Sequence, residues 1–155
     1  MRILVLEDDR VQQGRIEQTL LDIGRSRNLR LEIDIAKSYG DVEKYSQYFD
    51  NYQLYLLDLE IDGERERGFQ VAQQIRERDP FTSIVFVSTH SEALPLAFRY
   101  HLSALDFISK DQPEEDYRHQ LERCLDYVLA VDKRENMRLF TYSFEDRKST
   151  RLNSS

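Results

Sequence analysis

Five short apolar runs recur along the chain, and polar residues follow each of them. The runs lie at residues 2–6, 29–35, 54–57, 83–87 and 104–108. Short apolar runs between polar turns are typical of β-strands, and the alternation of apolar and polar residues at 29–35 is typical of a half-buried one. The runs at 54–57 and 83–87 are almost wholly apolar, which favours strands that are buried on both faces.

Apolar residues at helical spacing separate these strands. The pattern predicts helices at residues 9–23, 39–49, from about 69 to the Asp79-Pro80 pair, 92–100, and from about 117 to about 136. We expect Gly24 to end the first helix and Pro95 to weaken or bend the fourth. Regular alternation of strand and helix predicts an α/β fold, with a parallel sheet, right-handed crossovers and helices on both faces.

Composition and charge narrow the class of protein. With 155 residues, of which 40% are hydrophobic and 33% charged, the chain is expected to form one globular domain and a short appendage. The formal net charge of −7 argues against binding to nucleic acid or to a membrane surface, but it does not disfavour a cation site. Cys124 has no second cysteine to pair with, which indicates a reducing, cytoplasmic setting. No apolar run approaches the ~20 residues that span a membrane.

The last part of the chain follows a different pattern. Residues 139–144 alternate as a strand does, although no partner strand is evident. Because a lone strand is not stable, we expect the first strand of a second domain of which the rest is missing. Residues 131–138 are then a linker or an extension of the helix. Residues 148–155 are polar and patternless, and we expect frayed or non-native sequence there.

Residues with reactive side chains follow four of the five predicted strands. Glu7 and Asp8 come after the first strand, Asp58 after the third, Ser88 after the fourth and Lys110 after the fifth. The carboxyl ends of parallel strands lie at one edge of the sheet, where ligands bind in open α/β folds. We therefore expect these side chains to lie close together.

This set of residues predicts phosphoryl chemistry with a metal ion. Crowded carboxylates repel one another unless a cation lies between them, and hard oxygen ligands without a histidine or cysteine cluster favour Mg²⁺. Asp58 is then a carboxylate nucleophile for phosphorus, while Lys110 and the Ser88 hydroxyl bind the phosphoryl oxygens. Simpler explanations stay open at this point. Asp58 could cap a loop, Thr89 is a rival to Ser88, and the acids after the first strand could serve a helix dipole, as we expect for Asp9.

Together these residues resemble the response-regulator receiver domain, over residues 1–130. The resemblance implies a flavodoxin-like, or CheY-like, (βα)5 fold with strand order 2-1-3-4-5. It also implies that Asp58 is the phosphoacceptor and that the acid pair Glu7 and Asp8 holds Mg²⁺ together with Asp58. The backbone carbonyl of Glu60 is the remaining protein ligand that the resemblance implies.

The same resemblance implies a switch and its partners. Ser88 and Phe107 occupy the positions of the switch residues, and a sensor histidine kinase is the implied phosphoryl donor. Phosphorylation is expected to produce a homodimer through the surface near Phe98, Tyr100 and His101. The domain is a signalling protein in this reading, and catalyses only its own phosphorylation and dephosphorylation.

Two features depart from the common receiver pattern. Asp111 follows Lys110 where receivers commonly have proline, so the usual cis peptide bond is not implied, and the loop after Asp58 is longer and more charged. Both features, with the segments 88–92 and 103–107, resemble the AgrA/ComE group of quorum-sensing transcription regulators. Those proteins bind DNA through a LytTR-type domain, and residues 139–155 would be the start of one. DNA would be bound through that missing domain alone.

Two other functions fit parts of the pattern. A receiver fold could act as a dimerisation module without phosphorylation, although the complete set of acids and Lys110 argues against it. A haloacid-dehalogenase-type hydrolase also uses a strand-end aspartate and Mg²⁺. That enzyme needs a second aspartate two positions after the nucleophile, where this chain has Glu60.

Overall fold

Five parallel strands form a single sheet in the order β2-β1-β3-β4-β5. In the computed structural model the strands are β1 (Arg2–Leu6), β2 (Glu32–Ala36), β3 (Leu54–Leu57), β4 (Ser83–Ser88) and β5 (Asp106–Ser109). The structure describes the backbone of residues 1–153 and the side chains of residues 1–134 and 137. The predicted α/β class and strand order are confirmed.

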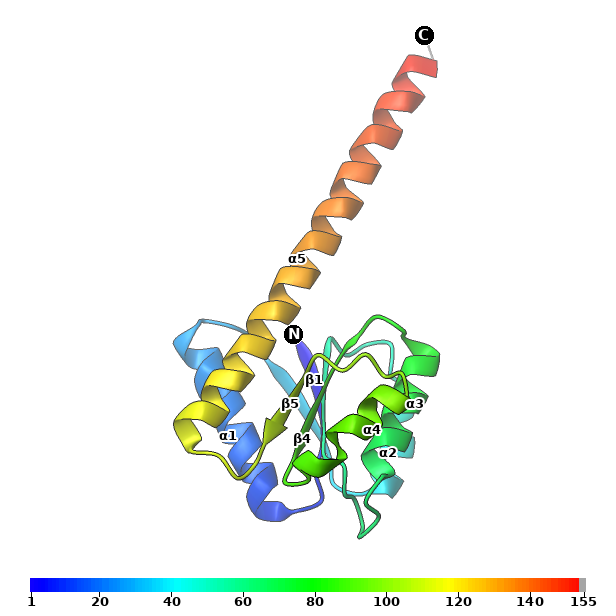
Figure 1. The fold of residues 1–155 in the computed structure, drawn as a ribbon. Coiled ribbons are helices and arrows are strands. Elements are labelled where there is room, and N and C mark those ends of the chain that lie inside the picture. Colours follow the sequence, from blue (N-terminus) through cyan, green and yellow to red (C-terminus); the bar gives the residue numbers. More distant parts are fainter. Residues whose placement is uncertain (154–155) are drawn as a thin grey trace. The chain divides into compact units, whose positions relative to one another are not determined.

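Helices lie on both faces of the sheet (Figure 1). They are α1 (Arg10–Ser26), α2 (Tyr39–Ser46), α3 (Arg67–Arg78), α4 (Leu94–Arg99) and α5 (Glu114–Asn153), with a short 3₁₀ helix, η1, at Ser91–Ala93. The first turns of α5 lie beside α1 on one face, and α2, α3 and α4 lie on the other (Figure 1). The chain divides into two compact units, Met1–Cys124 and Leu125–Ser155, and the sheet belongs to the first. Among the described residues, no helix combines the length and the apolar character that crossing a membrane requires.

Strand alternation divides the core between the two faces of the sheet. Leu4 and Leu6 of β1 belong to the apolar cluster that includes Phe69 of α3, whereas Ile3 and Val5 alternate to the opposite face. These four side chains are almost wholly buried. Burial of a side chain of this size contributes about 1.5–3 kcal/mol. Both faces of β1 are therefore apolar, as expected for a central strand of a parallel sheet.

Strand register brings the reactive residues to one edge. Leu6 of β1 lies opposite Leu57 of β3, so that the next residues, Glu7 and Asp58, leave the sheet side by side. The ladder continues one step further, because Asp58 N donates to Leu6 O at 2.9 Å. On the other side of β4, Lys110 N donates to the carbonyl oxygen of Ser88 at 3.1 Å.

Two predicted helix boundaries were wrong. Gly24 does not end α1 but lies buried within it, where a Cβ atom would be 3.1 Å from Leu29 O. The glycine therefore allows close approach of the next segment rather than a helix stop. Pro95 does not bend a helix over 92–100. It occupies the first turn of α4, after η1, where its missing N–H needs no partner.

The strand predicted at residues 139–144 is also wrong, because α5 is helical to Asn153. A helix satisfies its backbone hydrogen bonds within one segment, whereas a strand needs a neighbour to pair with. The proposed start of a second domain at residues 139–155 therefore stays a prediction, without the strand that suggested it. Residues 154–155 lie outside the described backbone.

Candidate functional site

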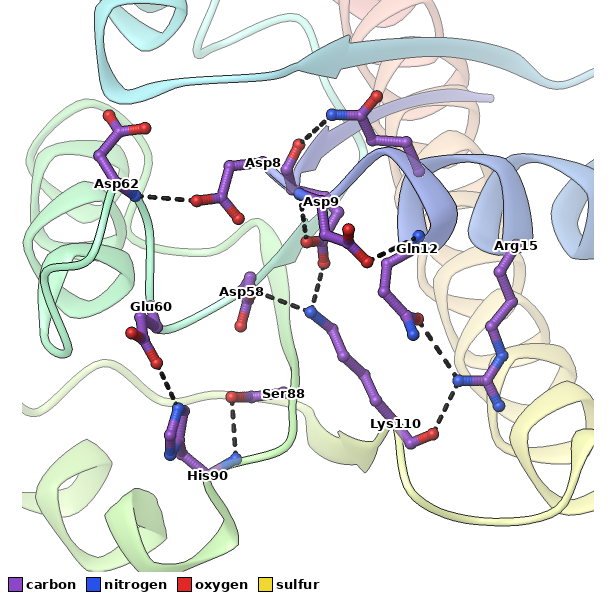
Figure 2. Close-up of polar contacts among 12 residues, drawn as sticks. Asp8, Asp9, Gln12, Arg15, Asp58, Glu60, Asp62, Ser88, His90 and Lys110 are labelled. Carbon is purple, nitrogen blue, oxygen red and sulfur yellow. Dashed lines mark hydrogen bonds and ion pairs between the residues drawn. The ribbon is translucent and has the colours of Figure 1, made fainter.

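A buried ammonium group lies between two buried carboxylates at the carboxyl edge of the sheet. Lys110 Nζ is 2.5 Å from Glu7 Oε2 and 2.8 Å from Asp58 Oδ2. The three side chains are no more than 8% exposed. Figure 2 shows Asp58 and Lys110 facing one another from β3 and the end of β5. The structure thus joins residues that are 52 positions apart in the sequence.

Burial dominates the electrostatics of this cluster. Removal from water, with repulsion from the Asp58 carboxylate, raises the pKa of Glu7 from 4.5 to about 7. The Lys110 ammonium favours the charged form of Glu7 but only partly opposes the effects of burial and repulsion. Burial by itself lowers the pKa of Lys110, but the neighbouring carboxylates of Asp58 and Glu7 outweigh it and raise that pKa above its ordinary value. The ammonium is therefore held charged, while Glu7 is held close to its point of half-protonation at neutral pH.

Asp8 supplies a third carboxylate from the more exposed side. Oxygens of Glu7, Asp8 and Asp58 lie within 4.8 Å of one another. Asp8 Oδ2 accepts a hydrogen bond of 2.9 Å from Asp62 N (Figure 2). Asp62 and Gly63 turn the chain back with positive φ angles of 54° and 80°, which presents that N–H toward Asp8.

The donor set of this cluster suits a small divalent cation. Three carboxylates face a single ammonium, so a dication would bring the local charge toward neutrality. Carboxylate oxygens are the hard ligands that Mg²⁺ prefers. Glu7, Asp8 and Asp58 therefore fit the metal that the sequence predicted. Glu60 directs its carboxylate to His90 instead, and the role expected for its carbonyl stays a prediction.

A glycine brings the start of α3 against the main chain of Asp58. Gly68 N donates to Leu59 O at 2.9 Å. A Cβ atom at Gly68 would lie 2.1 Å from the carbonyl oxygen of Asp58 and 2.7 Å from Leu59 Cα. Because both atoms belong to the backbone, no side-chain movement could relieve the clash. No local pattern in the sequence marks Gly68 for this packing role.

Ser88 and Thr89 differ in burial. Ser88 at the end of β4 is fully buried, and its Oγ accepts a 3.1 Å hydrogen bond from His90 N. The Ser88 hydroxyl can therefore still donate its own proton. Thr89 is exposed. His90 Nε2 lies 2.5 Å from Glu60 Oε2 and connects the loops after β3 and β4 (Figure 2).

Phe107, the second predicted switch residue, and Tyr100, one of the predicted dimer residues, make contacts with groups other than the carboxylates of the cluster. The half-buried Phe107 ring is 6.5 Å from the ring of Phe86, between centroids. Phe98 of α4 is 77% exposed. Tyr100 donates its hydroxyl proton to Glu66 at 3.0 Å and stacks on a core phenylalanine, while His101 is exposed and has a positive φ of 52°. These residues are accessible in part, and their expected roles stay predictions.

Arg15 was not singled out in the sequence but reaches the site from α1. Its Nη1 donates to the carbonyl oxygen of Lys110 at 2.7 Å (Figure 2). No periodic or motif signal marks this arginine, because its contact with Lys110 joins residues that are 95 positions apart in the sequence.

The arrangement can carry out transfer to a carboxylate. Asp58 is a buried oxygen nucleophile at a strand end, beside an ammonium that can bind an oxygen of an incoming group. The Ser88 hydroxyl and the acid pair Glu7 and Asp8 lie at the same edge of the sheet. Such a site suits a phosphoryl group, whose charge is spread over three oxygens.

Comparison with known proteins identifies relatives of this chain. The family model described as "Response regulator receiver domain" matches residues 3–122. Accessory gene regulator protein A of Staphylococcus epidermidis is 32% identical over 116 residues, which are 74% of this chain and 48% of that protein. The Staphylococcus aureus protein of the same name is 30% identical over 127 residues, 81% of this chain and 52% of its own length. The chain thus spans about half the length of these curated relatives.

Solved structures share the fold. The non-phosphorylated HemR receiver domain from Leptospira biflexa has a TM-score of 0.66 and 23% identity, covering 79% of this chain and 92% of that one. A response regulator receiver domain protein from Clostridium thermocellum has a TM-score of 0.66 and 15% identity, with coverage of 85% and 96%. At these identities the likeness concerns the fold alone.

Proposed function

The chain belongs to the response regulator receiver family, and we propose that it is a phosphorylation-controlled switch of a two-component system. Asp58 accepts a phosphoryl group from a sensor histidine kinase. The observation that carries this proposal is the buried Glu7–Lys110–Asp58 cluster, with Asp8 beside it. A structural ion pair would need one acid for one base, whereas two acids here share a single ammonium and a third carboxylate lies beside them.

The proposed reaction transfers phosphorus from nitrogen to oxygen. An Asp58 carboxylate oxygen forms a bond to phosphorus while the bond to the imidazole nitrogen of the donor breaks. The bonding electron pair leaves with that nitrogen, which takes up a proton. Mg²⁺, when bound by Glu7, Asp8 and Asp58, would supply positive charge to the phosphoryl oxygens and the carboxylates.

Residues of the chain bind the product of this reaction. Lys110 already lies 2.8 Å from Asp58 and can bind one phosphoryl oxygen with little movement of its ammonium. Ser88 can donate its hydroxyl proton to another, since its oxygen already accepts from His90 N. Inward movement of Ser88 would displace the loop after β4, which leads to α4. A local change of charge would then bias the position of a helix.

The output of the switch is proposed from the relatives. An Accessory gene regulator type of receiver would control transcription in quorum sensing through a LytTR-type DNA-binding domain. Dimerisation on phosphorylation would bring two such domains to paired half-sites. The exposed Phe98 on α4, with Tyr100 and His101 after it, supports a contact surface there.

Mass spectrometry of the intact chain tests the central claim. After incubation with acetyl phosphate and Mg²⁺, we expect the wild type to gain one phosphoryl group and Asp58→Ala to gain none. Asp50→Ala, which removes an exposed carboxylate that pairs with Arg78 and not with the cluster, is the control and should behave as the wild type. Phosphoryl uptake by Asp58→Ala would contradict the assignment of the nucleophile.

A second measurement separates the switch from its alternatives. Beryllofluoride with Mg²⁺ should shift the amide resonances of Asp58 and Ser88 in the full chain. An unchanged spectrum would favour a dimerisation module that works without phosphorylation. Turnover of phosphate esters would instead favour a hydrolase, although the ion pair of Glu60 with His90 argues against Glu60 as its acid–base group.

A further inference from the structure

Arg15 connects helix α1 to the loop that carries Lys110. Its Nη1 donates to Lys110 O at 2.7 Å, and its Nη2 donates a longer hydrogen bond of 3.4 Å to Gln112 O. The side chain is 14% exposed, so these bonds form in a largely water-free setting. One guanidinium therefore binds two main-chain carbonyls of the β5–α5 loop, and Figure 2 shows its contact with that of Lys110.

The guanidinium is itself held on its remaining sides. Its central carbon lies 3.9 Å from the ring centroid of Tyr117, which is 1% exposed. Its Nε faces Glu114 Oε1 at 2.8 Å as an ion pair. A planar, forked cation stacked on an aromatic ring has little freedom left, and a lysine could not reproduce these contacts together. Arg15 is thus a rigid support for the loop.

Besides Arg15, the loop after Lys110 is held by a hydrogen bond within the loop, from Asp111 N to Ser109 Oγ at 3.2 Å, which does not connect it to another element. Asp111 takes the place of the proline that receivers commonly have, and no cis peptide bond occurs in the described part of the chain. The peptide groups on both sides of the Lys110 Cα are nevertheless bound. Lys110 N donates to Ser88 O at 3.1 Å, and Lys110 O accepts from Arg15.

We propose that Arg15 is a positioning residue for the Lys110 ammonium, and hence for phosphoryl transfer to Asp58. The proposal rests on the function proposed above. Arg15 does not reach the carboxylates itself. It fixes the main chain from which the lysine side chain extends, so that the ammonium stays between Glu7 and Asp58 before transfer and can reach a phosphoryl oxygen afterwards.

Two measurements with opposite expected signs distinguish positioning from general stabilisation. The Lys110 ammonium and Mg²⁺ both bind the carboxylates of Glu7 and Asp58. A displaced ammonium should therefore make Mg²⁺ binding tighter, by about thirtyfold, as expected when one positive charge is removed from about 4 Å of a dication in water. The same displacement should slow phosphoryl uptake by about tenfold to a hundredfold, since a misplacement of about 1 Å can cost about a hundredfold.

The experiment uses the full chain with Arg15→Ala, Arg15→Lys, Lys110→Ala and the Arg15→Ala/Lys110→Ala double variant. Arg25→Ala is the matched control, because Arg25 is an exposed arginine of the same helix that pairs with Asp22. Binding of Mg²⁺ alone is measured by calorimetry, and uptake from acetyl phosphate by intact mass. We expect Arg15→Ala to bind Mg²⁺ more tightly and react more slowly, Arg15→Lys to recover part of the rate, and the double variant to match Lys110→Ala.

Other outcomes overturn the proposal. Wild-type behaviour of Arg15→Ala in both measurements would show that Ser88 O alone suffices to hold the loop. Weaker Mg²⁺ binding together with slower uptake, or an equal loss of rate when Lys110 is already absent, would assign Arg15 a structural role only. If the wild type takes up no phosphoryl group, the proposed function fails, whereas the calorimetric comparison still decides the role of Arg15. If Arg15→Ala does not fold, Arg15→Lys carries the same comparison.

Discussion

Replacement of Glu7 by glutamine should remove a pH-dependent loss of stability from the fold. The Glu7 carboxyl has a pKa of about 7 in the folded chain against 4.5 when exposed, chiefly because it is buried. The folded state therefore holds this proton more tightly than the unfolded state. The contribution of Glu7 to stability is greatest below pH 4.5, falls as the pH rises to about 7, and is constant above that.

The size of this effect follows from the two pKa values. One pKa unit corresponds to about 1.4 kcal/mol, so the rise from 4.5 to about 7 costs the fold about 3 kcal/mol at alkaline pH. Glu7→Gln keeps the shape and cannot ionise. The difference in unfolding free energy between Glu7→Gln and the wild type should therefore increase by about 3 kcal/mol between pH 4.5 and pH 8.

Urea unfolding followed by circular dichroism, with EDTA present, measures this difference at each pH. Contributions from other groups are common to both chains and cancel. One of these groups is His90, whose pKa is raised by its contacts with Glu60 and Glu92. Glu43→Gln removes an exposed carboxyl of α2 and is the control for loss of one charge. A difference that stays constant or decreases with pH would refute the reasoning, because it would mean that the Lys110 ammonium outweighs burial at Glu7.

Further variants test the packing and the hydrogen bonds around the site. Gly68→Ala should lower the unfolding free energy by about 1–3 kcal/mol, because the new Cβ would overlap the Asp58 main chain. Gly14→Ala, on the open side of α1, should raise the unfolding free energy by about 1 kcal/mol. Urea unfolding measures both variants. Ser88→Ala should slow phosphoryl uptake about tenfold or more, since a hydrogen bond to a charged group contributes about 1.5–3 kcal/mol, while Thr89→Ala should keep the wild-type rate by intact mass. Asp9→Ala should cost about 1 kcal/mol in thermal unfolding, because its Oδ2 caps α1 by accepting from the amide three residues on, at 3.2 Å.

The positions of the central strands could be predicted from apolar runs because β1, β3 and β4 are buried on both faces. Leu54–Leu57 is the clearest case, since all four side chains are buried and the polar Asp58 follows at once. The predicted bounds of the second strand were less accurate. Alternation begins at Leu29, but pairing with β1 covers only Glu32–Ala36. Alternation reports which side chains face the core, whereas the length of a strand also depends on where its partner begins.

The site was predictable where a strand end carries a reactive residue and unpredictable where tertiary contacts act through the main chain. Asp58 and Lys110 follow strands directly, so the parallel sheet alone brings them to one edge. Arg15 and Gly68 act on carbonyl oxygens of residues distant in the sequence, and every residue has a carbonyl. Their roles therefore depend on packing that no local pattern records.

The side chain and the main chain of Lys110 have different binding partners, and this determines which of them can move when the site changes. Its ammonium is shared by Glu7 and Asp58, so the phosphoryl dianion proposed for Asp58 would draw it away from at least one of them. Its main chain, however, is bound by Ser88 O and Arg15, and these bonds do not involve the carboxylates. The lysine can therefore change partners by side-chain rotation alone, while the end of β5 stays in place. The element left to respond by a backbone movement is the loop after Ser88, where a partly buried ion pair of His90 with Glu60 connects two strand ends.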